Sequence, residues 1–147
     1  MNDAPRGIEV MHKGEGSLLT LLKEAQRRHG YLPEEVVSEL AESLDIPVGE
    51  VYGVASFYSL LSTKPLGKNV IRICKCVPCY LKNSQAILET VEGELGIKPG
   101  ETTKDGKCSL QLTNCIGACD RAPAMTINHK LYVDLTPRKV IKILKRL

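Results

Sequence analysis

Apolar residues recur at helical spacing along the first part of the chain, which predicts three amphipathic helices. The first begins after Ser17, a favourable N-cap, and runs to about Arg28 before the stop at Gly30. The others begin at Pro33 and Pro47, because proline is favoured in the first helical turn. The positions expected to face one core are Leu18, Leu21, Leu22, Ala25, Val36, Val37, Leu40, Ala41, Leu44, Val51, Val54, Ala55, Phe57, Tyr58 and Leu61.

The pattern changes after Pro65 and Gly67, which are typical of a linker. Short β-rich runs then alternate with helical periodicity, and this order predicts an α/β arrangement in which helices pack on a small sheet. The last helix begins after Thr136 and is expected to turn Val140, Ile141, Leu144 and Leu147 inward. The expected elements are strands at 70–73, 107–113, 125–127 and 131–133 and helices at 84–95 and from 137 to the end.

Two domains are therefore expected, a helical domain over residues 1–67 and an α/β domain over residues 68–147. Residues 1–15 are polar and rich in charge, so we expect them to be poorly ordered. They lack the apolar core of a secretory signal, and no stretch of the chain matches a membrane span in length and apolarity. These features favour a cytoplasmic protein without membrane insertion.

All six cysteines lie in the second, basic part of the chain. Residues 70–147 hold 13 Lys and Arg against 7 Asp and Glu, whereas residues 1–69 hold 7 against 10. Cysteines in a chain without a signal peptide favour metal or redox chemistry over disulfides. A basic environment would stabilise an anionic metal–thiolate site. The chain has no Trp and one Phe, which argues against a platform for nucleic-acid bases.

The cysteines form two groups, CKCVPC from residue 74 and CIGAC from residue 115. Two close pairs on separate loops can supply four thiolates, which suit iron–sulfur clusters and zinc alike. Pairing Cys79 with either Cys74 or Cys76 satisfies the spacing of a structural zinc site, so spacing leaves zinc open. A third alternative is a thioredoxin-type dithiol of Cys76 and Cys79, which leaves Cys115 and Cys119 without a role. Cys108 lies in a predicted strand and is expected to be a small core residue.

Two blocks of sequence resemble the thioredoxin-like [2Fe–2S] ferredoxin family. The first block is the C-x4-C spacing of Cys74 and Cys79 followed by the C-x3-C spacing of Cys115 and Cys119, with Asp120 and Pro123 after it. The second block comprises the segments 30–33, 46–47 and 51–58, and the resemblance covers residues 17–147. It is greatest to the small iron–sulfur subunits of the complex I NADH dehydrogenase module and of NAD-linked hydrogenases and formate dehydrogenases.

The resemblance implies a small N-terminal three-helix bundle followed by a thioredoxin-like ferredoxin domain. It implies one [2Fe–2S] cluster with Cys74, Cys79, Cys115 and Cys119 as ligands. Two departures bear on this assignment: the family usually has an acidic residue where this chain has 111–114, and it does not require a cysteine at Cys76. Cys76 is accordingly either a spare thiol or an alternative ligand.

The chain contains no Gly-rich nucleotide motif and no nucleophile–base arrangement, so it is expected to carry electrons without a substrate site of its own. The resemblance implies a partner subunit that holds FMN, NAD(H) and usually a [4Fe–4S] cluster, within a hydrogenase, formate dehydrogenase or complex I assembly. Exposed thiols oxidise easily, so the extra thiol of Cys76 indicates an anaerobic organism and favours a soluble hydrogenase-type complex. Whether such a complex bifurcates electrons is left open by the sequence.

Overall fold

The computed structural model describes residues 17–147, and its internal contacts divide the chain into two compact units at the Pro65–Leu66 junction. The sequence-based boundary lies slightly later, after residue 67. The expectation of poor order over residues 1–15 concerns positions outside the described residues. The two units are described separately below.

The first unit contains three helices, as the sequence predicted. They are α1 (Leu18–His29), α2 (Glu34–Leu44) and α3 (Val48–Phe57). Gly30 ends α1 in the left-handed conformation, with φ of 81°, and this geometry favours glycine. The core of the unit is formed by Leu22, Ala25, Leu32, Val36, Val37, Leu40, Ala41, Val51, Ala55 and Leu61.

The predicted burial of two aromatic residues at the end of α3 is wrong. Phe57 is 80% exposed and Tyr58 is 39% exposed, and their rings meet edge to face at 5.1 Å between centroids. Phe57 lies two residues beyond the buried Ala55, which places it roughly 200° around the helix and away from the core. The helix ends at Phe57, earlier than predicted, although Leu61 is buried in the core as expected.

The second unit is built on a four-stranded sheet with the strand order β2-β1-β3-β4. Its strands are β1 (Asn69–Cys74), β2 (Cys108–Thr113), β3 (Met125–Ile127) and β4 (Lys130–Tyr132). Strands β1 and β2 are parallel, and the connection between them contains α5 (Ser84–Leu95). Strand β3 is antiparallel to both β1 and β4.

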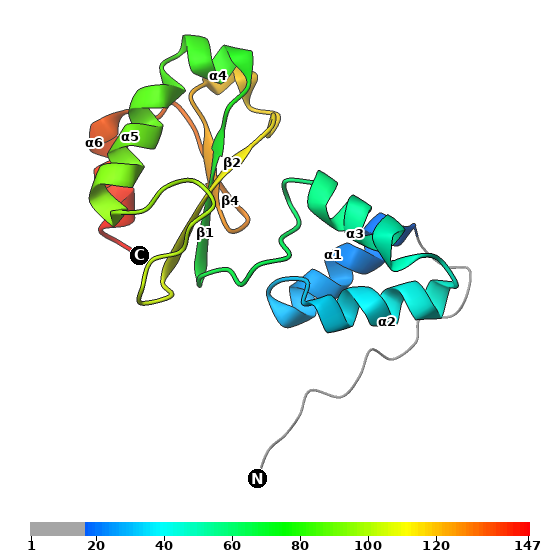
Figure 1. Ribbon diagram of the computed structural model, residues 1–147. Helices are drawn as coiled ribbons and strands as arrows, with labels where there is room; N and C mark the ends of the chain where they lie inside the picture. The colour runs from blue at the N-terminus through cyan, green and yellow to red at the C-terminus, as the bar shows by residue number, and fades with distance from the viewer. Residues whose placement is uncertain (1–16) are drawn as a thin grey trace. The chain divides into compact units, whose positions relative to one another are not determined.

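One face of this sheet is covered by α5 and by the last helix, α6 (Pro137–Leu144) (Figure 1). Thr136 caps α6 by accepting a hydrogen bond from the backbone N–H of Lys139, as its position before Pro137 predicts. Leu147 is 44% exposed, so its predicted inward orientation is wrong because α6 ends before it. The core comprises Ile71, Ile73, Ile87, Val91, Ile97, Cys108, Leu110, Met125, Ile127, Leu135 and Val140.

Two short elements of the second unit were not predicted. They are α4 (Val77–Leu81) and the 3-10 turn η1 (Cys119–Arg121). Within residues 17–147, the helices are too short or too polar to cross a lipid bilayer.

Candidate metal centre

The parallel pairing of β1 and β2 brings the two cysteine groups to one edge of the sheet. Cys74, the last residue of β1, pairs in register with Thr113, the last residue of β2. The backbone N–H of Lys75 continues this pairing by donating to the Thr113 carbonyl at 2.9 Å. The loops that follow the two strands therefore leave from the same edge. Cys74 at the end of β1 and Cys79 in α4 flank the first loop, and Cys115 and Cys119 follow β2; these are the cysteines proposed as ligands.

The pair on the first loop is buried. Cys74 and Cys79 are each 1% exposed and pack against Ala118 and Ala124. The backbone N–H of Cys74 donates to the Ala124 carbonyl at 3.2 Å, which ties the end of β1 to the segment before β3. Burial, and then the neighbouring Cys74 thiol, raise the pKa of Cys79 to about 11. A metal that binds here must displace this proton, because the thiolate is the ligand form.

The pair on the second loop lies at the surface. Cys115 and Cys119 are both exposed, and their sulfur atoms are 3.2 Å apart. The backbone N–H of Gly117 donates to the Cys115 sulfur at 3.4 Å, and this contact, together with Cys119, lowers the pKa of Cys115. Gly117 has φ of 80°, a backbone conformation that most other residues adopt only with strain. The hydrogen bond with Cys115 raises the pKa of Cys119.

An ion pair fixes the segment that follows Cys119. Arg121 donates from both Nε and Nη2 to the same carboxylate oxygen of Asp134, at 2.9 and 2.6 Å. The backbone N–H of Asp134 donates in turn to the Arg121 carbonyl at 2.9 Å. These contacts join the turn η1 to the segment before α6, so the second cysteine loop is held at both its ends.

Cys76 lies between the two pairs. Its thiol interacts with the thiol of Cys74 and with both the side chain and the backbone of Cys115. Burial is the main cause that raises the pKa of Cys76, and the neighbouring thiols add to it. Cys108 lies at the other end of the sheet, opposite Asn69, and is 5% exposed within the core. The prediction that Cys108 is a core residue is confirmed.

The five neighbouring thiols form two pairs and an intervening thiol rather than a single convergent set. Among the described residues, no three Cys, His or acidic side chains are grouped so that they could hold one metal ion. Two thiols on one tetrahedral iron are expected about 3.7 Å apart, given metal–sulfur bonds of about 2.3 Å. The 3.2 Å separation of the Cys115 and Cys119 sulfurs lies near that value. Four thiolates, two on each iron, are the donor set that a centre of two irons takes.

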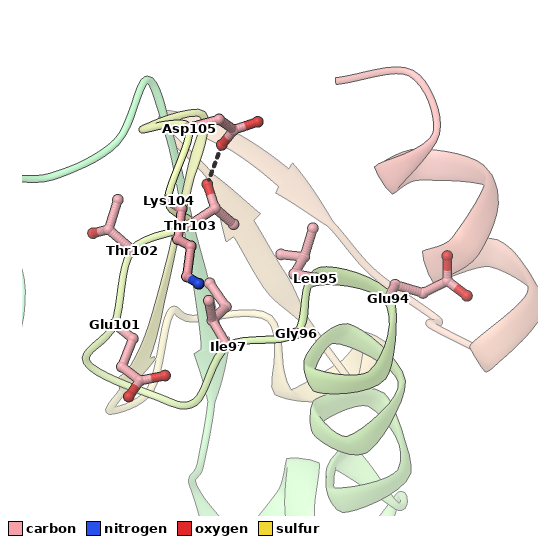
Figure 2. A pocket seen from close by; sticks show the side chains of 9 residues that line it. All are labelled: Glu94, Leu95, Gly96, Ile97, Glu101, Thr102, Thr103, Lys104 and Asp105. Atoms are coloured by element: carbon pink, nitrogen blue, oxygen red, sulfur yellow. Dashed lines mark hydrogen bonds between the residues drawn. The ribbon is translucent and has the colours of Figure 1, made fainter.

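A separate hollow lies at the opposite end of the sheet, beside the end of α5 (Figure 2). It contains no cysteine, and its hydrogen bond from Thr103 to Asp105, 2.6 Å long, belongs to the turn before β2. Gly106 in that turn accepts a hydrogen bond from Lys68, which precedes the start of β1. The residues that line the hollow are Glu94, Leu95, Gly96, Ile97, Glu101, Thr102, Thr103, Lys104 and Asp105.

One charged residue near the cysteines was not predicted to matter. Arg72 lies two residues before Cys74 and is 8% exposed. A charged side chain in the middle of the otherwise apolar run 70–73 is a signal by which the sequence could have drawn attention to it.

Comparison with known proteins identifies the family. The model of the family described as thioredoxin-like [2Fe-2S] ferredoxin matches residues 6–147 of this chain. The chain belongs to this family. As a thioredoxin-like [2Fe–2S] ferredoxin, it is assigned an iron–sulfur cluster, and the resemblance inferred from its sequence is confirmed.

The relatives of this ferredoxin include subunits of an NADH-quinone oxidoreductase and of a hydrogenase. It is 43% identical over 132 residues to a subunit of the NADH-quinone oxidoreductase of Rickettsia bellii, covering 89% of this chain and 79% of the relative. It is 37% identical over 137 residues to the HndA subunit of the NADP-reducing hydrogenase of Solidesulfovibrio fructosivorans, covering 93% and 80%.

A solved structure of an NAD+-reducing [NiFe]-hydrogenase in the air-oxidised state resembles this ferredoxin, with a TM-score of 0.72 and 25% identity. The match covers 86% of this chain but only 22% of the hydrogenase chain, so this ferredoxin spans about a fifth of that longer chain.

Proposed function

We propose that this chain is the electron-transfer subunit of an NAD(H)-dependent oxidoreductase and holds one [2Fe–2S] cluster through Cys74, Cys79, Cys115 and Cys119. The observation that carries the proposal is the meeting of the two cysteine pairs at one edge of the sheet, in a chain of this family. Iron–sulfur clusters of this type take four thiolates, two on each iron.

The buried and the exposed cysteine pair would have different roles in holding the cluster. Cys74 and Cys79 are buried, so they shield one side of the cluster from water and oxidants. Cys115 and Cys119 are exposed and leave the other side near the surface, where an electron can pass to a partner over a short distance. The N–H of Gly117 already donates to the Cys115 sulfur, and such bonds stabilise negative charge on the sulfur. When bound, the cluster would supply reversible uptake of one electron.

The partner is proposed to be a flavin-bearing subunit that binds NAD(H). A hydride carries two electrons, and a flavin beside a one-electron carrier separates them. The names of the relatives, which belong to an NADH-quinone oxidoreductase and a hydrogenase, support a complex of one of these two kinds. Purification of the native complex, with identification of its other subunits, distinguishes a complex I module from a soluble hydrogenase.

The metal content tests the proposal most directly. Protein purified without oxygen should contain about two irons and two acid-labile sulfides per chain. It should give an EPR signal after one-electron reduction. Stoichiometric zinc without iron, under conditions that allow cluster assembly, would contradict the proposal and favour a structural zinc module.

Serine variants test the ligand set. Cys74→Ser and Cys119→Ser should lose the cluster or change its spectrum, because a serine oxygen is harder and less easily deprotonated than a thiolate. Cys108→Ser is the matched control, since this thiol lies in the core away from the other five. Cys76→Ser should also keep the cluster. If Cys76→Ser loses it and Cys74→Ser keeps it, the assignment of ligands is wrong.

We further propose that the helical unit docks the flavin-bearing partner. Its exposed apolar residues at the end of α3 and just beyond it, Phe57 at 80% and Leu60 at 53%, support this role. Phe57→Ser should weaken co-purification with the partner while the iron content stays unchanged. Leu131→Ser, which changes an exposed apolar residue of the other unit, serves as the control. Equal recovery of the partner by both variants would reject docking through Phe57.

A further inference from the structure

Arg72 is the one charged residue among the buried side chains of the described chain. It is 8% exposed, whereas each of the other buried polar residues is a serine or a threonine. Burial lowers the pKa of Arg72, which shows that the surroundings disfavour its charge. An arginine nevertheless keeps its proton at neutral pH, so a positive charge is held inside this unit.

The position of Arg72 on β1 relates it to the metal centre. Side chains alternate between the two faces of a strand, and Ile71 and Ile73 belong to the core beneath α5 and α6. Arg72 therefore shares the opposite face with Cys74. The two residues are about 6.6 Å apart along the strand, from a rise of about 3.3 Å per residue.

Arg72 and Cys74 are both withdrawn from water. The register partners of Arg72 are Gln111 on β2 and Thr126 on β3, and both side chains are uncharged. Cys74, at the end of the same strand, is 1% exposed. Charges separated by buried protein interact more strongly than charges at the surface, because the effective dielectric constant is lower and salt cannot enter. The charge of Arg72 therefore acts on whatever the Cys74 thiolate binds.

We infer that Arg72 sets the reduction potential of the cluster by favouring the reduced state from within the sheet. The inference rests on the proposed function. Uptake of one electron adds one negative charge to the cluster and its four thiolates, while no bond forms or breaks. A fixed positive charge in a medium of low dielectric lowers the free energy of that added charge. Arg72 thereby raises the midpoint potential.

Substitution of Arg72 in the full-length, cluster-loaded protein tests the inference. Arg72→Gln and Arg72→Met remove the charge, while Arg72→Lys keeps it. EPR-monitored redox titration should show a more negative midpoint for the two neutral variants. The equilibrium constant for reduction should fall on the order of tenfold, which corresponds to about 59 mV for one electron. Arg72→Lys should titrate close to the wild type, and the g-values of all variants should stay unchanged.

Lys75→Gln is the matched control. Lys75 is adjacent to Cys74 in the chain but is exposed, so water and salt screen its charge. Its removal should shift the midpoint clearly less than removal of Arg72, although Lys75 is nearer to Cys74 in sequence. An equal or larger shift for Lys75→Gln would show that burial of Arg72 has no special effect, and would overturn the inference.

The other possible results with the Arg72 variants also support or overturn the inference. An unchanged midpoint in Arg72→Gln, or an equal shift in Arg72→Lys, overturns the inference because charge would then not matter. If the neutral variants assemble no cluster while Arg72→Lys does, the positive charge is needed to hold the anionic cluster, which supports it. If all three variants assemble none, shape rather than charge is required, and the inference fails. Absence of iron from the wild-type protein would instead refute the proposed function.

Discussion

Replacement of Gly67 by alanine is expected to destabilise the second unit, residues 66–147, which is the proposed cluster-binding unit. A Cβ atom at Gly67 would lie 2.9 Å from the Gly106 carbonyl oxygen and 3.0 Å from the backbone C and N atoms of Cys108. All three are backbone atoms, so no side chain can rotate to relieve the contact. The N–H of Gly67 also donates to the Ser109 hydroxyl at 2.7 Å, which holds Gly67 against the start of β2.

The size of the effect follows from this close contact. Adding a methyl group where the surroundings cannot yield costs about 1–3 kcal/mol of unfolding free energy. For a domain of this size, each kcal/mol lowers Tm by about 4–8 °C. Gly93→Ala is the matched control, because Gly93 lies within α5 and its added Cβ would meet no atom within 4 Å. There the same substitution should stabilise the protein by about 0.5–1 kcal/mol, since alanine favours the helix.

Urea unfolding of the apoproteins, followed by circular dichroism, measures both effects. Hydrogen exchange of the β1 and β2 amides shows whether the loss falls in the cluster-binding unit. The two variants should move the midpoint of unfolding in opposite directions. A Gly67→Ala protein as stable as the wild type, or stabilised like Gly93→Ala, would refute the close packing of Gly67 on β2.

Two further predictions concern the same unit. Leu110, fully buried at the centre of β2, should cost about 2–5 kcal/mol when replaced by alanine, measured by urea unfolding; a loss below about 1 kcal/mol would contradict its core position. Because the folded state raises the pKa of Cys79 to about 11 from an ordinary value of 9.0, the folded apoprotein binds that proton more tightly than the unfolded chain. Its stability should therefore be fully present below pH 9 and fall as the pH rises towards 11, and Cys79→Ala should flatten that decline in pH-dependent unfolding.

The elements that the sequence predicted best are those with several turns of clear periodicity. The helix predicted at 84–95 is observed as Ser84–Leu95, because Ile87 and Val91 are spaced to face the core and Gly96 provides the stop. The hairpin of β3 and β4 also follows from its sequence. Asn128 adopts φ of 53° in the turn, a conformation that asparagine tolerates better than most residues.

The errors arise where periodicity ends or is too short to read. Helix α4 has five residues, fewer than two turns, and begins among cysteines and a proline, so no apolar stripe marks it. The prediction that Phe57 is buried was wrong because Phe57 is the last residue of α3 and lies on the face away from Ala55, and no further turn follows in which the period would show that face. Leu147 shows the same limit at the end of α6.

The spacing of the cysteines could not by itself determine which of them bind a metal, or which metal they bind. Spacing alone allowed Cys79 to pair with Cys74 or Cys76, and it allowed zinc as well as iron. What the sequence lacks is the register of β1 on β2, which places Cys74 opposite Thr113 and brings the second loop beside the first. Pairing between distant strands is a tertiary property, so the sequence predicted that the two cysteine pairs meet but not the register by which they do.

Strand β1 contributes residues both to the hydrophobic core and to the candidate metal centre. Its side chains alternate between the two faces of the sheet, so the two sets of residues lie on opposite faces. On β1, Ile71 and Ile73 fill the space beneath the helices, while Arg72 and Cys74 face the other way. A shift of one residue in the register of β1 would turn Arg72 into the core and move Cys74 to the other face of the sheet. Packing of Ile71 and Ile73 opposes that shift, because it would take both side chains out of the core beneath the helices and place the charge of Arg72 among its apolar groups. The hydrophobic core thus decides which face of the sheet Cys74, the first proposed ligand, occupies.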